Sequence, residues 1–415
     1  MKKILTLILC FTTLMAYSQE TIVSYKKRVL ESVEIDLLAS YYSQDGDNAA
    51  VTGGIGTEEL TDIASNIVVS IPLNDDDILK IDANISAYTS ASSSNVNPYD
   101  NGDQPADPFV ASSGASASDV WVNGAVSYSH SSDDRNNVWG ANVSVASEYD
   151  YFSIGFGGNY SYLLNKKNTE LSIRANIFLD TWKTIYPIEL RPFEALGYTP
   201  LETDTRNSYA LGLGFSQILS KRAQGSLSLD LVQQQGLLST PFQRVYFADK
   251  NDIIVGNGFQ LADDIERLPN NRFKIAVGGR LNYYLNEVFV LRSYLRYYID
   301  NWGISSYTAS LEVPIKLGNL FTLYPSYRYY NQSESEYFYR ANEALSTDEF
   351  YTSDYDLSGF NANQFGFGVS YTDIFTKAKL LGYGIKSIDI NGSYYERSSS
   401  LSYFMVSGGI KFVQE

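Results

Sequence analysis

The stretch RFKIAVGGRLNY, residues 272–283, has an apolar residue, a glycine or a tyrosine at every odd position and mostly polar residues between them. Successive side chains of a strand point to opposite faces of a sheet, so this period of two predicts a strand with one apolar and one polar face. Residues 79–88 and 170–180 repeat it. Such runs last about a dozen residues, more than the roughly five or six of a typical strand, and suit a tilted strand that crosses a bilayer.

The links between the alternating runs differ in length in a regular order. Short polar turns are predicted at residues 74–77, 131–136, 165–168, 220–224, 286–287, 318–319 and 373–381. The links between them are mostly long, at 43–58, 92–119, 184–205, 235–271 and 333–358, with short exceptions near 150, 301–302 and 398–400. Short periplasmic turns and long extracellular loops are typical of outer-membrane barrels.

These two patterns predict the fold class. We expect an all-β chain, a transmembrane antiparallel up-and-down β-barrel of about 16 strands with short periplasmic turns and long extracellular loops. An even number of strands places both termini on the periplasmic side. The predicted strands are 31–43, 59–73, 78–91, 119–131, 136–148, 151–164, 169–183, 206–218, 224–234, 272–285, 288–300, 303–316, 320–332, 360–372, 383–397 and 400–413.

The 34 tyrosines agree with a membrane location. Tyr128 and Tyr160 lie toward the short-turn ends of their predicted strands, and Tyr41 and Tyr329 lie toward the long-loop ends. Two interfacial girdles explain this placement, because the tyrosine ring suits the acyl boundary and its hydroxyl reaches water. The alternative is a tyrosine-rich soluble β protein that binds glycans, which does not explain the asymmetry of the links.

The first 18 residues have the features of a secretory signal peptide. Lys2 and Lys3 precede an apolar run over residues 4–15, and Ala16-Tyr17-Ser18 supplies small residues for cleavage. The apolar run is too short to span a membrane as a helix. We therefore predict a signal peptide at 1–18, a short periplasmic lead-in at 19–30 and an outer-membrane barrel at 31–415.

Charge and composition exclude several kinds of function. Loss of Lys2 and Lys3 leaves 29 basic against 47 acidic residues, a net charge of −18, which argues against a nucleic-acid partner. The predicted mature chain has no cysteine and one histidine, His130, beside a periplasmic turn. A zinc cluster of cysteine and histidine and a disulfide framework are excluded. The predicted position of His130 favours local hydrogen bonds over catalysis, so we predict that the protein is not an enzyme.

Four segments carry a resemblance to a known family. They are YYSQDGDNAAVTGGIGTEEL at 41–60, SYSHSSDDRN at 127–136, LYPSYRYY at 323–330 and FYTSDYDL at 350–357. Together they span almost the whole mature chain. They resemble an uncharacterised Bacteroidota family of outer-membrane β-barrels, the domain of unknown function family number 3570. The resemblance implies the bacterial outer membrane and the barrel class, and no activity.

A patch of arginines is predicted on the inner face of the barrel. If the turn at 286–287 is tight, Arg280 and Arg292 face each other, and Glu312 falls in the same layer one strand on. The next layer outward holds Arg296 and Arg328. Like charges directly opposite are destabilising unless they are compensated, so Glu312, a carboxylate from an infolded loop or an anionic ligand must neutralise the patch.

An acidic wall is predicted on the far side, because Glu34, Asp36, Asp82 and Glu148 also point inward by parity. A basic strip opposite an acidic wall resembles the transverse field of a porin constriction. The same charges also suit a lattice of salt bridges that braces a plugged barrel. Barrels of about this strand number usually leave an aqueous channel, which slightly favours a wet lumen.

One loop is a candidate calcium site. Residues 43–48 bring Asp45 and Asp47 close to a glycine, as hard-cation loops do, and residues 100–107 are similar. The complete helix-loop-helix spacing is absent, and most such runs are solvated turns. We predict no cofactor and no metal, with a loop calcium as the alternative.

The leading prediction for function is a porin-like channel or receptor for small solutes in the bacterial outer membrane, in contact with outer-membrane lipid. The alternative is a non-conducting scaffold barrel that holds a periplasmic or surface partner protein. A lumen filled by residues 235–271 or 92–119 would favour the scaffold, and a lumen free of them would favour the channel.

Overall fold

The computed structural model describes residues 28–90, 117–191, 202–255 and 258–414. Sixteen long strands form the wall, and the short β17 (Ile315–Leu317) and β20 (Lys379–Leu380) join the same sheet. The wall strands are β1 (Glu34–Asp45), β2 (Leu60–Pro72), β3 (Asp77–Ser90), β4 (Ala117–Ser131), β5 (Asn137–Ser147), β6 (Tyr151–Leu164), β7 (Thr169–Lys183), β8 (Thr203–Ser220), β9 (Ala223–Gly236), β14 (Asn271–Tyr284), β15 (Val290–Asp300), β16 (Ser305–Glu312), β18 (Phe321–Gln332), β19 (Phe360–Thr372), β21 (Tyr383–Arg397) and β22 (Ser402–Gln414).

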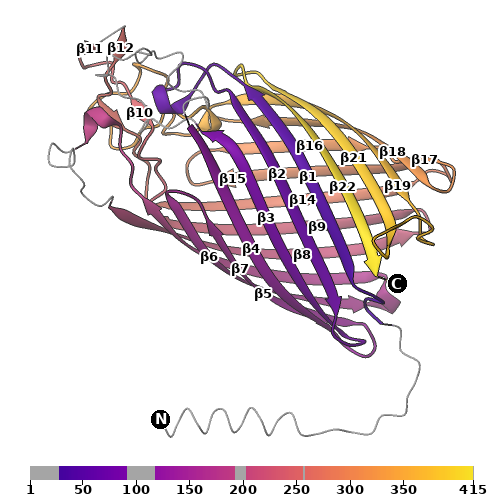
Figure 1. The fold of residues 1–415 in the computed structure, drawn as a ribbon. Coiled ribbons are helices and arrows are strands. Elements are labelled where there is room, and N and C mark those ends of the chain that lie inside the picture. The colour runs from indigo at the N-terminus through magenta and orange to yellow at the C-terminus, as the bar shows by residue number, and fades with distance from the viewer. Residues whose placement is uncertain (1–27, 91–116, 192–201, 256–257, 415) are drawn as a thin grey trace, which may run out of the picture.

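The sheet closes on itself (Figure 1). Each wall strand pairs antiparallel with the next one along the chain, and β1 pairs with β22 from Glu34 opposite Val413 to Asp45 opposite Ser402. Closure leaves no unpaired sheet edge in the wall, which is the condition for a sheet in hydrocarbon. The predicted fold class, an antiparallel barrel of sixteen strands, is confirmed. None of the helices in the described residues is both long and apolar enough to cross a membrane.

The wall strands agree with the predicted ranges within four residues at each end. The largest difference is in the strand predicted at 303–316, where β16 ends at Glu312 and β17 resumes at Ile315. Pro314 lies between them, and a proline has no N–H to donate to a neighbouring strand. Its carbonyl still accepts the N–H of Val290, so the wall continues past the break.

The two faces of the wall differ in chemistry as the period of two predicts. On β15, Leu295 and Tyr297 point outward and are exposed, while Arg292 and Arg296 point inward. On β14, Val277 and Leu281 are exposed on the same outer side as Leu295. A continuous exposed apolar surface on the outside of a closed barrel is the surface that hydrocarbon covers.

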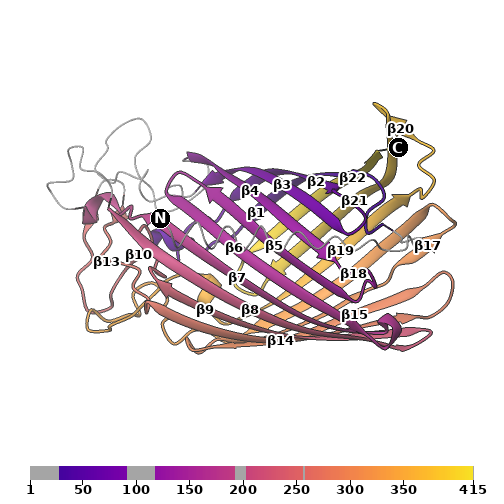
Figure 2. The same ribbon diagram turned by 90° about the horizontal axis from the view of Figure 1, so that it is seen from below.

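The links gather by length at the two ends of the barrel. The C-terminal end of β22 and the short links lie at one end, and the small strands β10 (Arg244–Val245), β11 (Ile254–Val255), β12 (Phe259–Gln260) and β13 (Asp264–Ile265) lie at the other (Figures 1 and 2). Three 3₁₀ turns also lie in long links: η1 (Ala50–Thr52), η5 (Ile188–Leu190) and η7 (Tyr355–Leu357). A fourth, η4 (Asn165–Lys167), forms a short link.

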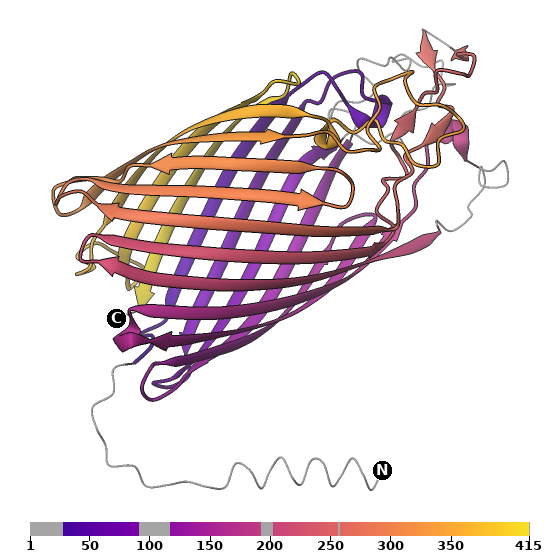
Figure 3. The same ribbon diagram turned by 180° about the vertical axis from the view of Figure 1, so that it is seen from behind.

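The long links pack together into one unit. We call the described residues 46–58, 184–191, 237–255, 258–270 and 333–359 the cap. The cap stays at its end of the barrel and does not run down the interior, as the views from opposite sides show (Figures 1 and 3). The predicted loop at 92–119 falls almost wholly outside the described residues, as do the predicted signal peptide and most of the lead-in.

We predict that an arginine on the outer face is more costly than one on the inner face. Val277→Arg should lower the free energy of unfolding by about 2–4 kcal/mol, because Val277 lies near the middle of β14 where hydrocarbon would surround the charge. Leu38→Arg is a matched control, because Leu38 is 46% exposed on the inner face and Val277 is 50% exposed on the outer face. Urea titration of folding in lipid vesicles measures both, and equal losses would contradict the assignment of faces. Ala276, on the inner face beside Val277, is too buried to serve as the control.

Candidate functional site

Four arginines with exposed side chains line the inner face of neighbouring strands. Arg280 belongs to β14, Arg292 and Arg296 to β15, and Arg328 to β18, and all four alternate with outward apolar residues. Each is solvent-exposed although it points into the barrel. Long inward side chains can be exposed only if the interior holds open space, so the lumen here is not filled by packed side chains.

The register of this strip differs from the prediction. Arg280 lies opposite Tyr294 and Arg292 lies opposite Asn282, so the two arginines do not face each other. The link is wider than a tight turn, because the Asn286 side chain accepts the N–H groups of Val288 and Phe289 at 2.9 Å. The resulting shift of two residues keeps both arginines on the inner face, since a strand alternates every residue.

The arginines of the strip differ in their partners. Arg292 pairs with Glu312 on the neighbouring strand at 2.8 Å, in the layer predicted for it. The Arg280 guanidinium lies 4.5 Å from the centre of the Tyr294 ring. Among the described residues, Arg280, Arg296 and Arg328 form no ion pair with a carboxylate. Arg296 lies opposite Thr308, whereas Arg328 lies opposite Ser310, two residues from the predicted layer.

The four residues of the predicted acidic wall lie at different heights in the barrel. Asp82 is on β3, which lies eight strands from β15 in either direction, and its carboxylate accepts a hydrogen bond from Asn66 at 2.8 Å. Glu148 follows the last residue of β5 at the cap end, where burial and the nearby Asp150 raise the pKa of its carboxyl. Only Asp82 of these two therefore lies within the wall opposite the arginine strip.

Glu34 and Asp36 are near the short-link end and are neutralised by lysines. Lys386 Nζ lies 2.6 Å from Glu34 Oε1, and Lys411 Nζ lies 3.2 Å from Asp36 Oδ1. The sequence reasoning missed both lysines. Lys411 could have been found, because closure of the barrel pairs the last strand with the first and sets Lys411 opposite Asp36.

A further inner ion pair was also missed. Arg174 on β7 reaches Asp230 on β9 at 2.7 Å, across the intervening strand β8. Gly212 makes this crossing possible, because a Cβ there would lie 2.5 Å from Arg174 Nε. The alternation along each strand places all three residues on the inner face, and this shared face could have predicted the ion pair.

The cap is held by a buried arginine. Arg244 and Glu189 are fully buried and make a two-point ion pair, with Nε 2.7 Å from Oε1 and Nη2 3.1 Å from Oε2. Arg244 Nη1 also donates to the carbonyl of Val51 at 3.0 Å, and the Arg244 carbonyl accepts from the Ser353 hydroxyl at 3.0 Å. One residue therefore connects four links that are distant in the sequence.

A buried carboxyl group lies in the same cap. Glu266 accepts hydrogen bonds from the Thr352 hydroxyl and, at 2.6 Å, from the N–H of Thr240. Burial, together with the nearby Asp354, raises the pKa of Glu266 to about 8. Burial, together with the charge of Asp356, also raises the pKa of Asp354. Glu266 is therefore protonated and uncharged in the folded cap at neutral pH.

The candidate calcium loop is organised by its own hydrogen bonds. Asp45 is the last residue of β1, and Asp47 follows two residues later, after Gly46. The Glu58 carboxylate accepts the N–H of Asn48 at 3.1 Å, and the Asn48 side chain donates to the carbonyl of Ser399 at 2.7 Å. Across the part of the chain that the structure describes, no cluster of three or more acidic, histidine or cysteine side chains has the geometry of a metal site. Residues 100–107 lie outside that part.

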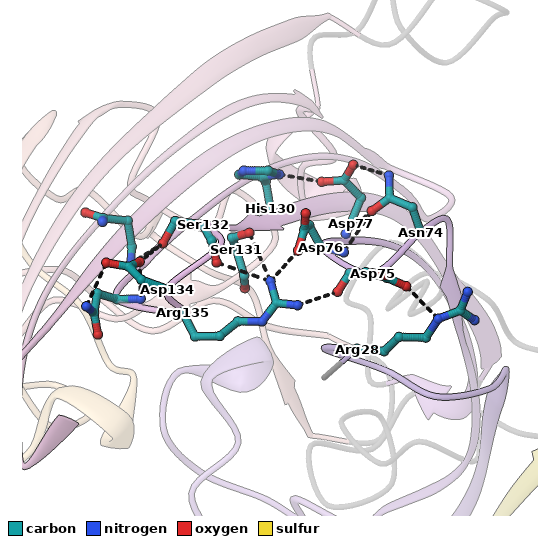
Figure 4. A network of polar contacts seen from close by, with 12 residues as sticks. Arg28, Asn74, Asp75, Asp76, Asp77, His130, Ser131, Ser132, Asp134 and Arg135 are labelled. Carbon is teal, nitrogen blue, oxygen red and sulfur yellow. Dashed lines mark hydrogen bonds and ion pairs between the residues drawn. The ribbon is translucent and has the colours of Figure 1, made fainter. Parts of the chain in front are cut away.

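His130 belongs to a polar network that ties two neighbouring short links (Figure 4). Its Nδ1 lies 2.6 Å from Asp77 Oδ1 on the adjacent strand. Arg135 donates to the Asp76 carboxylate and, at 2.7 Å, to the carbonyl of Asp75, whose carboxylate pairs with Arg28. The network bridges two hairpins and the start of the described chain, which is a structural role.

Comparisons with known proteins concern the family and the barrel shape. The family described as "Protein of unknown function (DUF3570)" matches residues 8–401. No curated protein matches the chain. A solved bacterial polysaccharide outer membrane secretin is 11% identical, with 92% of this chain and 99% of that chain covered and a TM-score of 0.47.

Two other solved structures are similar at the same level. The TodX monoaromatic hydrocarbon channel deltaS2 mutant is 11% identical, with 93% of this chain and 91% of that chain covered and a TM-score of 0.41. The siderophore receptor PirA from Pseudomonas aeruginosa is 10% identical, with a TM-score of 0.40. The matched region covers 89% of this chain and 57% of PirA, so this chain spans little more than half of the receptor.

We predict that the cap loosens as the pH rises. The pKa of Glu266 is about 8 in the folded cap, whereas its ordinary value is 4.5. Between these two pH values the folded cap keeps the Glu266 proton and the opened cap releases it. The stability of the cap should therefore fall from about pH 5 to pH 8 and level off above. Protection factors of amides 240–255 and 258–270 in hydrogen exchange measure this fall. Glu266→Gln should make this fall shallower, with the raised pKa of Asp354 supplying the remainder, and an unchanged slope in that variant would contradict the account.

Proposed function

We propose that this chain, which belongs to the DUF3570 family of proteins of unknown function, forms a passage or a receptor for small solutes in a bacterial outer membrane. The observation that carries the proposal is the exposure of charged side chains on the inner face. Arg292 is 50% and Arg174 is 62% exposed although both point into the barrel. Water-accessible charges along the interior are what a solute would meet in a channel.

The membrane location is supported by the outer face. Exposed Leu295, Tyr297 and Val277 belong to an outward surface of large apolar side chains on a closed sheet. In water such a surface would drive association, whereas hydrocarbon covers it without cost. The start of β1 and the end of β22 both lie at the short-link end of the barrel, which we assign to the periplasm.

The arginines without a carboxylate partner would give the lumen a preference for anions. The carboxylates Glu34, Asp36 and Glu312 each have a cationic partner, whereas Asp82 on the opposite wall is bound by the neutral Asn66. Arg280, Arg296 and Arg328 have no ion-pair partner among the described residues, so the wall formed by β14, β15 and β18 carries net positive charge. A fixed charge in a narrow, partly desolvated pore is weakly screened and favours anions.

The scaffold remains the second candidate, favoured by the link after β19. Ile374, Phe375 and Leu381 are almost fully exposed in it. The same link contains β20, which stands out from the barrel wall at the short-link end (Figure 2). An apolar tip on this side would suit a periplasmic partner protein. We propose no catalytic activity for either candidate and no cofactor.

We predict that the purified protein conducts ions in planar bilayers and that Arg296→Glu moves its reversal potential toward cation selectivity. Arg296 is the better position than Arg292, because Arg292→Glu would also leave Glu312 beside a second carboxylate. Arg222→Glu in the short link between β8 and β9 makes the same charge change outside the wall and should leave the reversal potential unchanged. A conducting protein with equal shifts for both variants would remove the arginine strip from selectivity. A folded protein without conductance would favour the scaffold.

A further inference from the structure

A pocket of about 390 Å³ lies on the inner face at the cap end of the barrel. Its wall is formed by β1, β18, β21 and β22, and the cap contributes Glu58, Asp354 and Asp356. Four tyrosines and two arginines line it from the barrel: Tyr42, Tyr330, Tyr395, Tyr403, Arg328 and Arg397. A solute that enters the lumen from the cap side would meet this pocket before the arginines at 280, 292 and 296.

Three of the tyrosines form a row of stacked and tilted rings, which we call the tyrosine platform. The rings of Tyr395 and Tyr403 stack with centroids 4.6 Å apart and planes 13° apart. The Tyr42 ring lies 4.9 Å from that of Tyr403 on its other neighbouring strand. Such a row offers apolar ring surface and hydroxyl groups together, which suits a ligand with an apolar face and a polar rim.

Arg397 is the polar feature of the pocket. Its side chain is only 3% exposed, its Nη1 donates to Asp356 at 2.6 Å, and its guanidinium lies 4.7 Å from the Phe360 ring centre. Its Nε and Nη2 are buried and have no hydrogen-bond partner among the described residues. These two atoms form one edge of the guanidinium fork, which binds two oxygen atoms side by side.

Arg244 shows what the same edge binds elsewhere in this protein. There Nε and Nη2 are filled by the two oxygens of Glu189 at 2.7 and 3.1 Å. Buried donors without partners are costly, so a ligand that brings two neighbouring oxygens to Arg397 would be favoured. The two oxygens can belong to a carboxylate or to neighbouring hydroxyl groups of a ring.

The surrounding charges distinguish these ligands. An organic anion would meet the carboxyl groups of Glu58, Asp354 and Asp356, and an organic cation would meet Arg328 and Arg397. A neutral ring with neighbouring hydroxyls avoids both costs, because each hydroxyl accepts from an arginine and donates to a carboxylate. We propose that this pocket binds a neutral sugar ring, packed against the tyrosine platform and held at two hydroxyls by Arg397. The inference rests on the proposed function only for the route by which the sugar arrives.

Binding is tested on the purified, folded barrel in detergent by saturation-transfer NMR and calorimetry. The probes are glucose, galactose and maltose, with glucuronate and choline as charged controls. At least one neutral sugar should bind more tightly than both controls. Arg397→Lys keeps the charge but loses the fork, so binding should weaken at least tenfold. Tyr403→Leu removes the platform and should weaken it similarly. Arg174→Lys, an inner arginine outside the pocket, should bind as the original protein does.

Three outcomes would overturn the inference: no neutral sugar bound at tens of millimolar, tighter binding of glucuronate or choline, or unchanged binding in both Arg397→Lys and Tyr403→Leu. The shift in gel mobility on heating shows whether each variant is folded, and Tyr403→Leu alone decides the test if Arg397→Lys does not fold. Conductance is measured separately. A barrel that binds sugar but does not conduct refutes passage only, and a conducting barrel that binds no sugar refutes this inference only.

Discussion

The pairing of β1 with β22 is the interaction on which the rest of the structure depends. In hydrocarbon every backbone N–H and C=O must be satisfied within the protein, and a sheet meets this condition only when it has no edge. Once the sheet is closed, the period of two assigns every side chain to the outer or the inner face. The apolar outer surface, the charged inner surface and the position of all links at two ends follow from that single closure.

Closure also determines how charge is managed inside the barrel. Pairs such as Arg292 with Glu312 link adjacent strands, and Arg174 reaches Asp230 across a strand that carries a glycine. These pairs relieve part of the repulsion in the wall without filling the interior. Arg280 and Arg296, which have no carboxylate partner, lie outside the tyrosine pocket, whereas Arg328 borders this pocket at the cap end. The lumen thus offers two chemically distinct zones in sequence.

Much of the wall could be predicted from the sequence, because the alternation is local and repeats along each strand. The ranges for β6, β7, β19 and β21 agree residue for residue with the structure. The register at residues 285–289 could not be predicted, since it depends on a side chain, Asn286, that caps the link. The cap was also beyond reach: Glu189, Val51 and Ser353 meet around Arg244 without any period in the sequence that connects them. The pocket around Arg397 could not be predicted for the same reason, because the cap forms part of its lining.

The most direct test of the account is the environment of each position along β15. The sequence has one cysteine, Cys10, so single cysteines at positions 291–299 of a Cys10→Ser variant can carry a spin label in lipid vesicles. The account predicts an alternation, with odd positions accessible to oxygen dissolved in lipid and even positions accessible to a water-soluble nickel complex. Accessibility to the nickel complex at odd and even positions alike would contradict a membrane barrel with a wet lumen. Exclusion of the complex from the even positions would contradict the open interior.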